Sequence, residues 1–594
     1  MAFISAKNLI YKIKKRNENN EVTHTDMILN HISLDIEEGE FVAVVGRNGS
    51  GKSTFARHLN ALLYADEGTL IIDGNDVSEV DKLWDIRKAC GMVFQNPDNQ
   101  IVGVTLEEDV AFGLENLEVE STVMNEIVND SLKRVGLSEY KTRTTNELSG
   151  GQKQRLSISS VLAMKPKCIV FDEVTSMLDP KGRRDVLDII YELNRTEHIT
   201  VVYITHDMNE IVDADRIYLI DDGVCKFNGT ARQLFEQPEL VKSSGLKLPT
   251  VTELSWRLYQ CGCLPRYNIL SREELLEEYV RYNNKELSDK KENQKLRDTD
   301  FEQIPERASN HSSNQSSDVT PILKLRDLGY QYNQDTNMTL SGVNLDIYEN
   351  EFIGIAGHTG SGKSTLMQIL DGLYKKTEGN IYFHGKDIDD EKFDKKNYHF
   401  HVGLVFQYPE SQLFEETVLK DVMYGPLNMG MSQDDARQIA EDTLKKLGIS
   451  PKDFDKSPFQ MSGGEKRKVA IAGVFAMNPE VIILDEPTAG LDAVSRDRLF
   501  ELLYEFHQTE KKTILVVSHS MEDIAKYADR VIVMNQGKKV LDEETRTAFA
   551  NTDIITNAGL DVPEINKIMT LFREHGIIQE NMVLTVDEAV KLLD

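Results

Sequence analysis

The sequence predicts an α/β protein made of two similar domains in tandem, and three observations support this prediction. A glycine-rich stretch of nine residues, 46–54, occurs again at 357–365. Further motifs follow each stretch in the same order and at nearly the same spacing. Short, continuous apolar runs precede the motifs, as expected for strands buried on both faces of a mainly parallel sheet. The length of 594 residues also exceeds what one hydrophobic core usually supports.

The repeated motifs align the two copies. Lys363 follows Lys52 by 311 residues, and the later motifs are 312 or 313 residues apart. These later pairs are Gln95 with Gln407, Ser149-Gly150-Gly151 with Ser462-Gly463-Gly464, Asp172-Glu173 with Asp485-Glu486, and His206 with His519. Such an ordered set indicates a duplicated nucleotide-binding unit.

Each copy is predicted to begin with a strand, a glycine-rich turn and a helix. The apolar runs 41–45 and 352–356 are the predicted strands, and they lead directly into the glycine-rich stretches. Further buried strands of the core sheets are predicted at 168–171, 200–204, 481–484 and 513–517.

The repeat continues beyond the nucleotide motifs and sets the predicted domain boundaries. Ser271 with Glu274, and Thr585 with Glu588, have the spacing of helix capping boxes, which predicts a small helical extension in each copy. Residues 288–320 are charged and rich in Ser, Asn, Asp and Gln, as in a flexible linker. The predicted order is a nucleotide domain, a helical extension, a linker, a second nucleotide domain and a second extension, at 1–240, 241–287, 288–320, 321–550 and 551–594.

Composition excludes several classes of function. Lys and Arg total 68 against 98 Asp and Glu, and the net charge of -30 disfavours direct binding to nucleic acid or anionic lipid. The five cysteines form no CxxC pair and the start lacks a secretory pattern, so we expect a reducing cytosol. No apolar run approaches the ~20 residues that cross a bilayer, so any membrane role requires a partner.

The glycine-rich stretches match GxxxxGK[ST] and predict two sites for the phosphates of ATP. Backbone N–H groups at a helix N-terminus face the phosphates, and Lys52 and Lys363 reach the β- and γ-phosphates. A loop that serves only as a turn is the alternative. The predicted ATP-binding residues are Gly46, Asn48, Gly49, Ser50, Gly51, Lys52, Ser53 and Thr54, and Gly357, Thr359, Gly360, Ser361, Gly362, Lys363, Ser364 and Thr365.

Polar residues after the buried strands predict a Mg²⁺ site and a catalytic base in each copy. Glu173 and Glu486 are placed to activate the water that attacks the γ-phosphate, and a histidine follows 33 residues later in both copies. Solvated acids and structural histidines are the alternative. The predicted Mg²⁺ ligands are Ser53, Gln95, Asp172, Ser364, Gln407 and Asp485, and the predicted catalytic residues are Glu173, His206, Glu486, His519, Gln95 and Gln407.

The segments 148–152 and 461–465 contain Ser-Gly-Gly before a basic, helix-compatible stretch. Alone, this string predicts only a turn and a helix cap. Together with the other motifs, it makes the chain resemble the ATP-binding cassette ATPases over nearly the whole of each half. That resemblance implies that each Ser-Gly-Gly segment completes the ATP site of the other copy. The site on Lys363 would be completed by Ser149, Gly150, Gly151 and Gln152, and the site on Lys52 by Ser462, Gly463, Gly464 and Glu465. The resemblance also implies that the interface between the halves is lined by Asp179 and Asp492.

A Gln-x-Pro-acid-x-Gln segment follows in both copies, at 95–100 and 407–412. Proline and an acid suit the start of a short helix. These segments, with 172–180 and 485–492, resemble the paired ATPases of energy-coupling factor importers of the cobalt and vitamin type, here fused in one chain. The resemblance implies that Asp98 and Glu410 meet an arginine on a coupling helix of a transmembrane protein. An exposed helix-capping acid is the alternative.

In the resembled family, an aromatic residue near the first strand usually stacks on adenine, and the two copies differ at this position. Tyr332 fits this role in the second copy, whereas the alignment puts Ile13 in the first. Gln152 against Glu465 is a second difference. Because both glutamates and both histidines are present, we predict that both sites hydrolyse ATP.

The predicted function is ATP hydrolysis at two composite sites between halves that pair within the chain. This hydrolysis would energise an importer of a micronutrient, such as a vitamin or a Co or Ni ion, at the cytoplasmic face of the membrane. The resemblance implies two partners, a transmembrane coupling protein and a membrane protein that binds the substrate. A soluble tandem ATPase acting on ribosomes or DNA is the main alternative, which the net charge of -30 disfavours. A conventional importer or exporter ATPase is a third possibility and differs in the Gln-x-Pro-acid segments.

Overall fold

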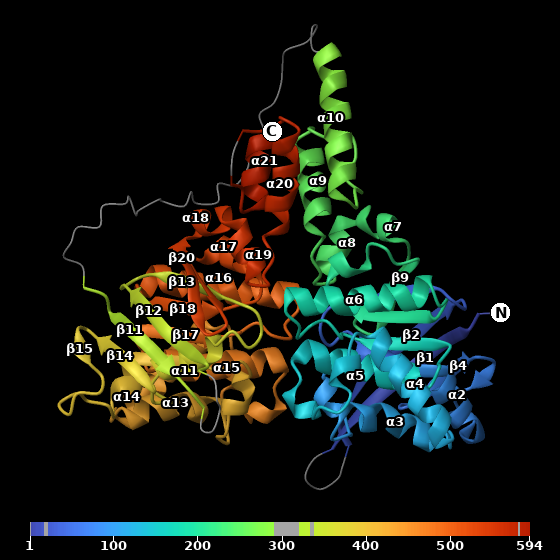
Figure 1. Ribbon diagram of the computed structural model, residues 1–594, viewed down its shortest axis with the longest axis horizontal. Helices are drawn as coiled ribbons and strands as arrows, with labels where there is room; N and C mark the ends of the chain where they lie inside the picture. Colours follow the sequence, from blue (N-terminus) through green and yellow to red (C-terminus); the bar gives the residue numbers. More distant parts are fainter. Residues whose placement is uncertain (1, 17–21, 290–319, 333–337, 580–581) are drawn as a thin grey trace. The chain divides into compact units, whose positions relative to one another are not determined.

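The computed structural model describes residues 2–16, 22–289, 320–332, 338–579 and 582–594 (Figure 1). Most of the predicted linker, residues 290–319, lies outside the described residues. The chain forms two compact units. The first comprises Met1–Glu253, Thr488–Leu499 and Gly559–Asp561, and the second comprises Leu254–Pro487, Phe500–Ala558 and Val562–Asp594.

A six-stranded sheet forms the core of the first unit, in the order β10-β9-β3-β8-β7-β6. All neighbours are parallel except β9 and β10. The predicted strands at 41–45, 168–171 and 200–204 are confirmed, and every residue of these strands is buried. The strands are β3 Phe41–Val45, β6 Cys90–Val93, β7 Cys168–Asp172, β8 Thr200–Thr205, β9 Arg216–Asp221 and β10 Val224–Gly229.

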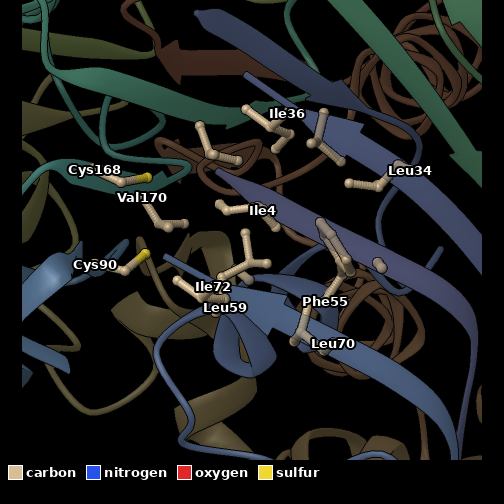
Figure 2. Packing of buried hydrophobic residues seen from close by; sticks show 14 of the residues in the cluster. Ile4, Leu34, Ile36, Phe55, Leu59, Leu70, Ile72, Cys90, Cys168 and Val170 are labelled. Atoms are coloured by element: carbon tan, nitrogen blue, oxygen red, sulfur yellow. The ribbon is translucent and has the colours of Figure 1, made fainter. Parts of the chain in front are cut away.

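A second, antiparallel sheet in this unit has the order β2-β1-β4-β5. Its strands are β1 Ile4–Arg16, β2 Val22–Ile36, β4 Glu67–Ile72 and β5 Asn75–Asp76. One apolar core joins both sheets to helix α1, Lys52–Leu59. Figure 2 shows Phe55 and Leu59 of α1 near Ile4 and Ile72 of the antiparallel sheet, with Val170 of the parallel sheet in the same cluster. This packing fixes the helix that begins at the phosphate loop.

Helices cover the first unit, and some of them pack together as a helical subdomain. Helix α5 contacts both α3 and α4, and it also contacts α6 (Figure 1). The helices are α2 Leu83–Ala89, α3 Leu106–Asn116, α4 Ser121–Arg134, α5 Gly150–Ala163, α6 Pro180–Arg195, α7 Ala231–Phe235, α8 Pro238–Ser243 and α9 Thr250–Gln260, the last of which continues into the second unit.

The second unit repeats the two sheets, in the orders β16-β17-β18-β13-β19-β20 and β12-β11-β14-β15. The predicted strands at 352–356, 481–484 and 513–517 are confirmed. The strands are β11 Leu323–Tyr330, β12 Leu340–Ile347, β13 Phe352–Ala356, β14 Glu378–Phe383, β15 Lys386–Asp387, β16 Val402–Val405, β17 Val481–Asp485, β18 Thr513–Val517, β19 Arg530–Asn535 and β20 Lys538–Glu544. Both copies therefore have the α/β fold with a mainly parallel core sheet.

Helices α13, α14 and α15 contact one another in the second unit, as α3, α4 and α5 do in the first. The helices that follow β13 are α11 Lys363–Leu370, α12 Tyr398–His401, α13 Val418–Asn428, α14 Gln433–Lys446, α15 Gly463–Phe475, α16 Ala493–Glu510, α17 Met521–Tyr527, α18 Thr545–Ala550 and α19 Thr552–Asn557. None of the helices among the described residues has the length and apolar character that a membrane span requires.

The C-terminal helices of the two copies pack together in the second unit. These helices are α9, α10 Arg272–Asp289, α20 Glu564–Glu574 and α21 Val586–Leu593 (Figure 1). Arg272 Nη2 pairs with Glu564 Oε2 at 2.7 Å, and the Tyr279 hydroxyl donates to the Leu593 carbonyl at 3.0 Å. The predicted caps form: Ser271 Oγ accepts from the Glu274 N–H at 3.1 Å, and Thr585 Oγ1 accepts from the Glu588 N–H at 3.3 Å.

Candidate nucleotide sites

The phosphate loops have the same backbone geometry in both copies. Gly51 and Gly362, directly before α1 and α11, have φ of 104° and 97°, a region that favours glycine. A Cβ at Gly51 would lie 2.9 Å from the Ile28 carbonyl oxygen, and one at Gly362 would lie 2.7 Å from Leu340 Cδ2. Both glycines are therefore required for the loop to turn into its helix.

The loop lysines fold back on the carbonyls of their own loops. Lys52 Nζ donates to the Gly46 and Arg47 carbonyls at 2.8 and 2.9 Å. Lys363 Nζ makes the equivalent bonds to Gly357 and His358 at 2.8 and 2.9 Å. Burial lowers the pKa of Lys52, although the charge of Glu173 opposes this shift. A buried ammonium with carbonyl partners is well placed to bind a phosphate anion that enters the loop.

An aspartate ends the strand beside each loop. Ser53 Oγ donates to Asp172 Oδ1 at 2.9 Å. Asp485 occupies the same position at the end of β17, and its Oδ1 is buried without a hydrogen-bond partner among the described residues. Burial raises the pKa of both aspartates, with Ser53 and Ser364 opposing the shift. Such oxygen ligands suit a hard divalent cation.

The glutamate after each aspartate has an unusual backbone conformation. Glu173 and Glu486 have φ of 50° and 47°, which is uncommon for a residue other than glycine. The next strand holds each of them: the Glu173 N–H donates to the Ile204 carbonyl at 3.0 Å, and the Glu486 N–H donates to the Val517 carbonyl at 3.1 Å. Strain of this kind, found at the same position in both copies, is typical of functional residues.

The structure brings the predicted glutamine and histidine to the glutamate in both copies. In the first, Gln95 Nε2 donates to Glu173 Oε2 at 3.2 Å, while His206 Nδ1 lies 3.7 Å from Glu173 Oε1. Lys52 Nζ lies 3.4 Å from the same Oε1. Glu173 is therefore surrounded by three donor groups, and its contact with His206 is longer than a hydrogen bond.

The second copy has shorter contacts. Gln407 Nε2 donates to Glu486 Oε2 at 2.9 Å, and His519 Nε2 lies 2.6 Å from Glu486 Oε1. Burial disfavours the ionised form of both glutamates, but the neighbouring histidine and lysine outweigh it, so the pKa of each carboxyl is lowered. Both glutamates are ionised at neutral pH and can accept a proton from water.

The Ser-Gly-Gly segments begin helices α5 and α15 in the two copies. Ser149 forms a capping box with Gln152: the Ser149 N–H donates to Gln152 Oε1 at 2.9 Å, and Ser149 Oγ accepts from the Gln152 N–H at 3.3 Å. Ser462 and Glu465 form the same box, with distances of 3.0 and 3.4 Å. Each segment thus presents a helix N-terminus, which favours anions. Asp179 caps α6 by accepting from the Gly182 N–H at 2.7 Å, and Asp492 accepts from the Ser495 N–H at 2.8 Å.

The Gln-x-Pro-acid segments form short 3₁₀ helices at Pro97–Asn99 and Pro409–Gln412. Asp98 pairs with Lys153 at 2.6 Å, and Glu410 lies 3.5 Å from Arg467. These two cations were not predicted from the sequence. Ser176, whose Oγ accepts from Gln95 Nε2 at 3.3 Å, was not predicted either. Their positions were the available signal, because Lys153 and Arg467 are cations near the start of the helix that follows each Ser-Gly-Gly.

Strand register supports the alignment of Ile13 with Tyr332. Ile4 pairs with Ile36 and Ile72, and Leu323 pairs with their counterparts Ile347 and Phe383. The first strands of the two copies therefore align Ile4 with Leu323. Ile13 and Tyr332 lie the same number of residues after Ile4 and Leu323, so Ile13 aligns with Tyr332. The Tyr332 hydroxyl shares a hydrogen bond of 3.1 Å with Thr365 Oγ1, and its ring lies 5.0 Å from that of Tyr330.

Each site therefore has an ionised carboxylate beside a loop shaped for phosphate, at the carboxyl ends of parallel strands where open α/β sheets bind ligands. The fold and the two sites define a nucleotide hydrolase of the phosphate-loop class, present twice in one chain.

The chain belongs to the ABC transporter family, whose sequence profile matches residues 29–176 and 340–489. It is an ABC-type ATPase with two cassettes, and domains of this family bind ATP. A protein of Methanosarcina mazei that carries the name of an ABC transporter ATP-binding protein is 33% identical over 577 residues, covering 95% of this chain and 94% of the relative.

Two further relatives match about half of the chain. An energy-coupling factor transporter ATP-binding protein of Clostridium perfringens is 46% identical over 273 residues, which is 46% of this chain and 96% of the relative. The solved structure of cbiO1 from Clostridium perfringens, described as part of the ABC transporter complex cbiONQ, is 37% identical. It covers 42% of this chain and 99% of its own, with a TM-score of 0.37.

Proposed function

We propose that this ATPase energises a membrane importer of the energy-coupling factor type, through a separate transmembrane protein at the cytoplasmic face of the membrane. A second membrane protein would select the substrate, a micronutrient such as a vitamin or a Co or Ni ion. The proposal is supported by the 46% identity to an energy-coupling factor ATP-binding protein over nearly the whole of that relative. A soluble ATPase acting on ribosomes or DNA is disfavoured by the net charge of -30.

The observation that carries the proposal is an acid that is followed within six residues by exposed apolar side chains in both copies. We define the first docking surface as Asp98, Val102 and Val104, whose valines are 60% and 68% exposed. The second docking surface is Glu410, Phe414 and Tyr424, whose rings are 57% and 48% exposed and lie 4.8 Å apart. Exposed apolar groups close in the sequence to an acid suit a helix that carries a cation among apolar residues.

The catalytic residues have defined roles in this proposal. Residues 46–54 and 357–365 bind the phosphates of ATP. Ser53 with Asp172, and Ser364 with Asp485, would hold Mg²⁺ together with Gln95 and Gln407. Asp485 Oδ1 fits such an ion because it is buried and has no hydrogen-bond partner among the described residues. When bound, Mg²⁺ neutralises charge on the phosphate oxygens. Glu173 and Glu486 accept the proton of the attacking water, and His206 and His519 orient that water.

The sites are proposed to be composite, with halves that pair within the chain. The site on Lys363 would be completed by Ser149, Gly150, Gly151 and Gln152. The site on Lys52 would be completed by Ser462, Gly463, Gly464 and Glu465. One contact supports this pairing: in the first unit, which includes Thr488–Leu499, the Asn48 side chain donates to the Gly490 carbonyl at 2.9 Å. Asn48 belongs to the first phosphate loop, and Gly490 follows Glu486 in the second copy.

Co-purification from membranes tests the proposed function. The tagged full chain is expected to bring down a transmembrane protein, and the double variant with Asp98→Arg and Glu410→Arg is expected to lose it because a partner cation would then be repelled. The matched control reverses two exposed acids of the same helical subdomains, Glu126→Arg and Asp434→Arg, and should keep the partner. Recovery of no membrane protein by the wild-type chain would refute the importer, whereas retention by the docking variant would refute the docking surfaces.

A further inference from the structure

Both docking acids are paired with a cation on the helix that begins at Ser-Gly-Gly. Lys153 Nζ lies 2.6 Å from Asp98 Oδ1, and Lys153 is four residues beyond Ser149 in α5. Arg467 Nη2 lies 3.5 Å from Glu410 Oε2, and Arg467 is five residues beyond Ser462 in α15. A direct electrostatic link therefore connects each docking surface with the first turns of its own Ser-Gly-Gly helix.

The link arises at different sequence positions in the two copies. With the offset of 313 residues that aligns Ser149 with Ser462, Lys153 corresponds to Lys466 and Arg467 corresponds to Gln154. Gln154 donates to the Phe94 carbonyl instead, at 3.2 Å. The same kind of pair is thus formed by residues that do not align. This argues that the pairing itself matters, rather than one inherited side chain.

Positive charge near a helix N-terminus has a definite effect. The N-terminus already carries a partial positive charge, so a nearby cation increases its attraction for anions. An acid paired with that cation cancels much of this increase. Asp98 therefore masks the charge of Lys153 toward an anion at Ser149, and Glu410 masks Arg467 in the same way.

The copies differ in how deeply the pair is buried. The side chains of Lys153 and Asp98 are 19% and 63% exposed, and those of Arg467 and Glu410 are 6% and 34% exposed. Glu410 Oε2 is buried and has no hydrogen-bond partner among the described residues, although Arg467 lies within ion-pair distance. The Glu410 side chain as a whole is 34% exposed, so an incoming donor reaches this carboxylate through its accessible part and not through the buried Oε2.

We propose that docking of the membrane partner unmasks these cations: a guanidinium of the partner takes over Asp98 and Glu410, and the freed charges of Lys153 and Arg467 strengthen phosphate binding at the two Ser-Gly-Gly helix starts. This inference rests on the proposed function. At the exposed Asp98 a guanidinium is the appropriate competitor because it binds a carboxylate through two parallel N–H bonds, whereas an ammonium acts as a point charge. Lys153 and Arg467 are thus positioning residues that transmit docking to the nucleotide.

A double-mutant cycle on the full chain without any partner tests this inference in the first copy. Asp98→Asn unmasks Lys153 and is expected to lower the KM for ATP about threefold, the size of effect typical of one partly exposed ion pair. With Lys153→Gln already present, Asp98→Asn has no cation to unmask and should give the KM of Lys153→Gln alone. The effect should also shrink as ionic strength rises.

The control is a pair in the same helical subdomain that lies off the Ser-Gly-Gly helix. Glu107 pairs with Lys141 at 3.2 Å, and Glu107→Gln should leave the KM unchanged. The variant Lys153→Arg should restore the response to Asp98→Asn. An equal effect of Asp98→Asn with and without Lys153, or none in either, overturns the inference. This experiment contains no partner, so its outcome is independent of the co-purification. A failed co-purification would refute the importer but not the masking of Lys153 by Asp98.

Discussion

The two nucleotide sites share a backbone conformation but differ in the side-chain contacts of the carboxylate that we propose as the catalytic base. Both glutamates have the same strained φ and the same backbone bond to the next strand. The histidine contact is 2.6 Å at Glu486 and 3.7 Å at Glu173. Duplication has therefore kept the backbone that places this carboxylate, while the distance from the carboxylate to the neighbouring histidine has changed.

A second difference concerns the region expected to hold adenine. The second copy has Tyr332, linked to Thr365 and to the ring of Tyr330. The first copy has Ile13, which is 44% exposed. An isoleucine offers apolar contact without an aromatic face, so the two sites are expected to differ in affinity as well as in catalysis.

The largest expected effect tests whether both sites hydrolyse ATP. Glu173→Gln and Glu486→Gln each remove a proton acceptor of the proposed mechanism, a loss of about 10²–10⁴ in rate at the altered site. Each single variant should therefore lose a measurable part of the steady-state ATPase rate, and the double variant should lose nearly all of it.

The control for this prediction is Glu126→Gln, an exposed carboxylate on α4, which should retain the full rate. A single variant with the wild-type rate would show that its glutamate takes no part in hydrolysis. Loss of all activity in one single variant would show that the sites hydrolyse only together.

Substitution of the two histidines should change the pH dependence of the two sites to different extents. Glu173 and Glu486 must be ionised to accept a proton, and the nearby histidines help to lower the pKa of both carboxyls against burial. Without His519, the pKa of Glu486 rises, so activity at that site is lost at a higher pH as the solution is acidified. His519→Ala should therefore move the acidic limb of the pH–rate profile upward and reduce the rate at neutral pH by roughly 10-fold or more.

His206→Ala is the matched comparison and should shift the acidic limb less. The reason is that His206 lies 3.7 Å from Glu173, whereas His519 lies 2.6 Å from Glu486, so His206 contributes less to lowering the pKa of its carboxyl. The profiles are best measured with the other site silenced by its Glu→Gln substitution. Equal shifts in both variants would contradict the contrast between the two sites.

Much of the fold follows from local sequence because its signals are strong. The strands at 41–45 and 352–356 are continuous apolar runs, since both faces of their sheets are covered. Gly51 and Gly362 were recognisable because their loops need a residue without a side chain. The site glutamates and histidines could be placed together because parallel strands bring their carboxyl ends to one edge.

Contacts between distant segments could not be predicted in the same way. The pairing of Asp98 with Lys153 depends on how a 3₁₀ turn packs against α5, and neither residue has an unusual local pattern. The packing of α10 against α20, with the Arg272–Glu564 pair, joins residues 292 apart through charges that are common on helix surfaces. The different histidine distances depend on side-chain orientation, which sequence motifs do not encode.

The smallest expected effect concerns nucleotide affinity. Tyr332→Ala removes an aromatic face worth about 0.5–1.5 kcal/mol in stacking, so the Kd for ATP at the second site should rise roughly 2- to 10-fold. Ile13→Tyr should lower the Kd at the first site by a similar factor and bring the two sites closer together. Binding of a fluorescent ATP analogue, measured with both Glu173 and Glu486 changed to Gln, resolves the two sites without turnover. Tyr332→Phe should retain the wild-type affinity if stacking matters, whereas a loss equal to that of Tyr332→Ala would assign the effect to the hydrogen bond with Thr365 instead.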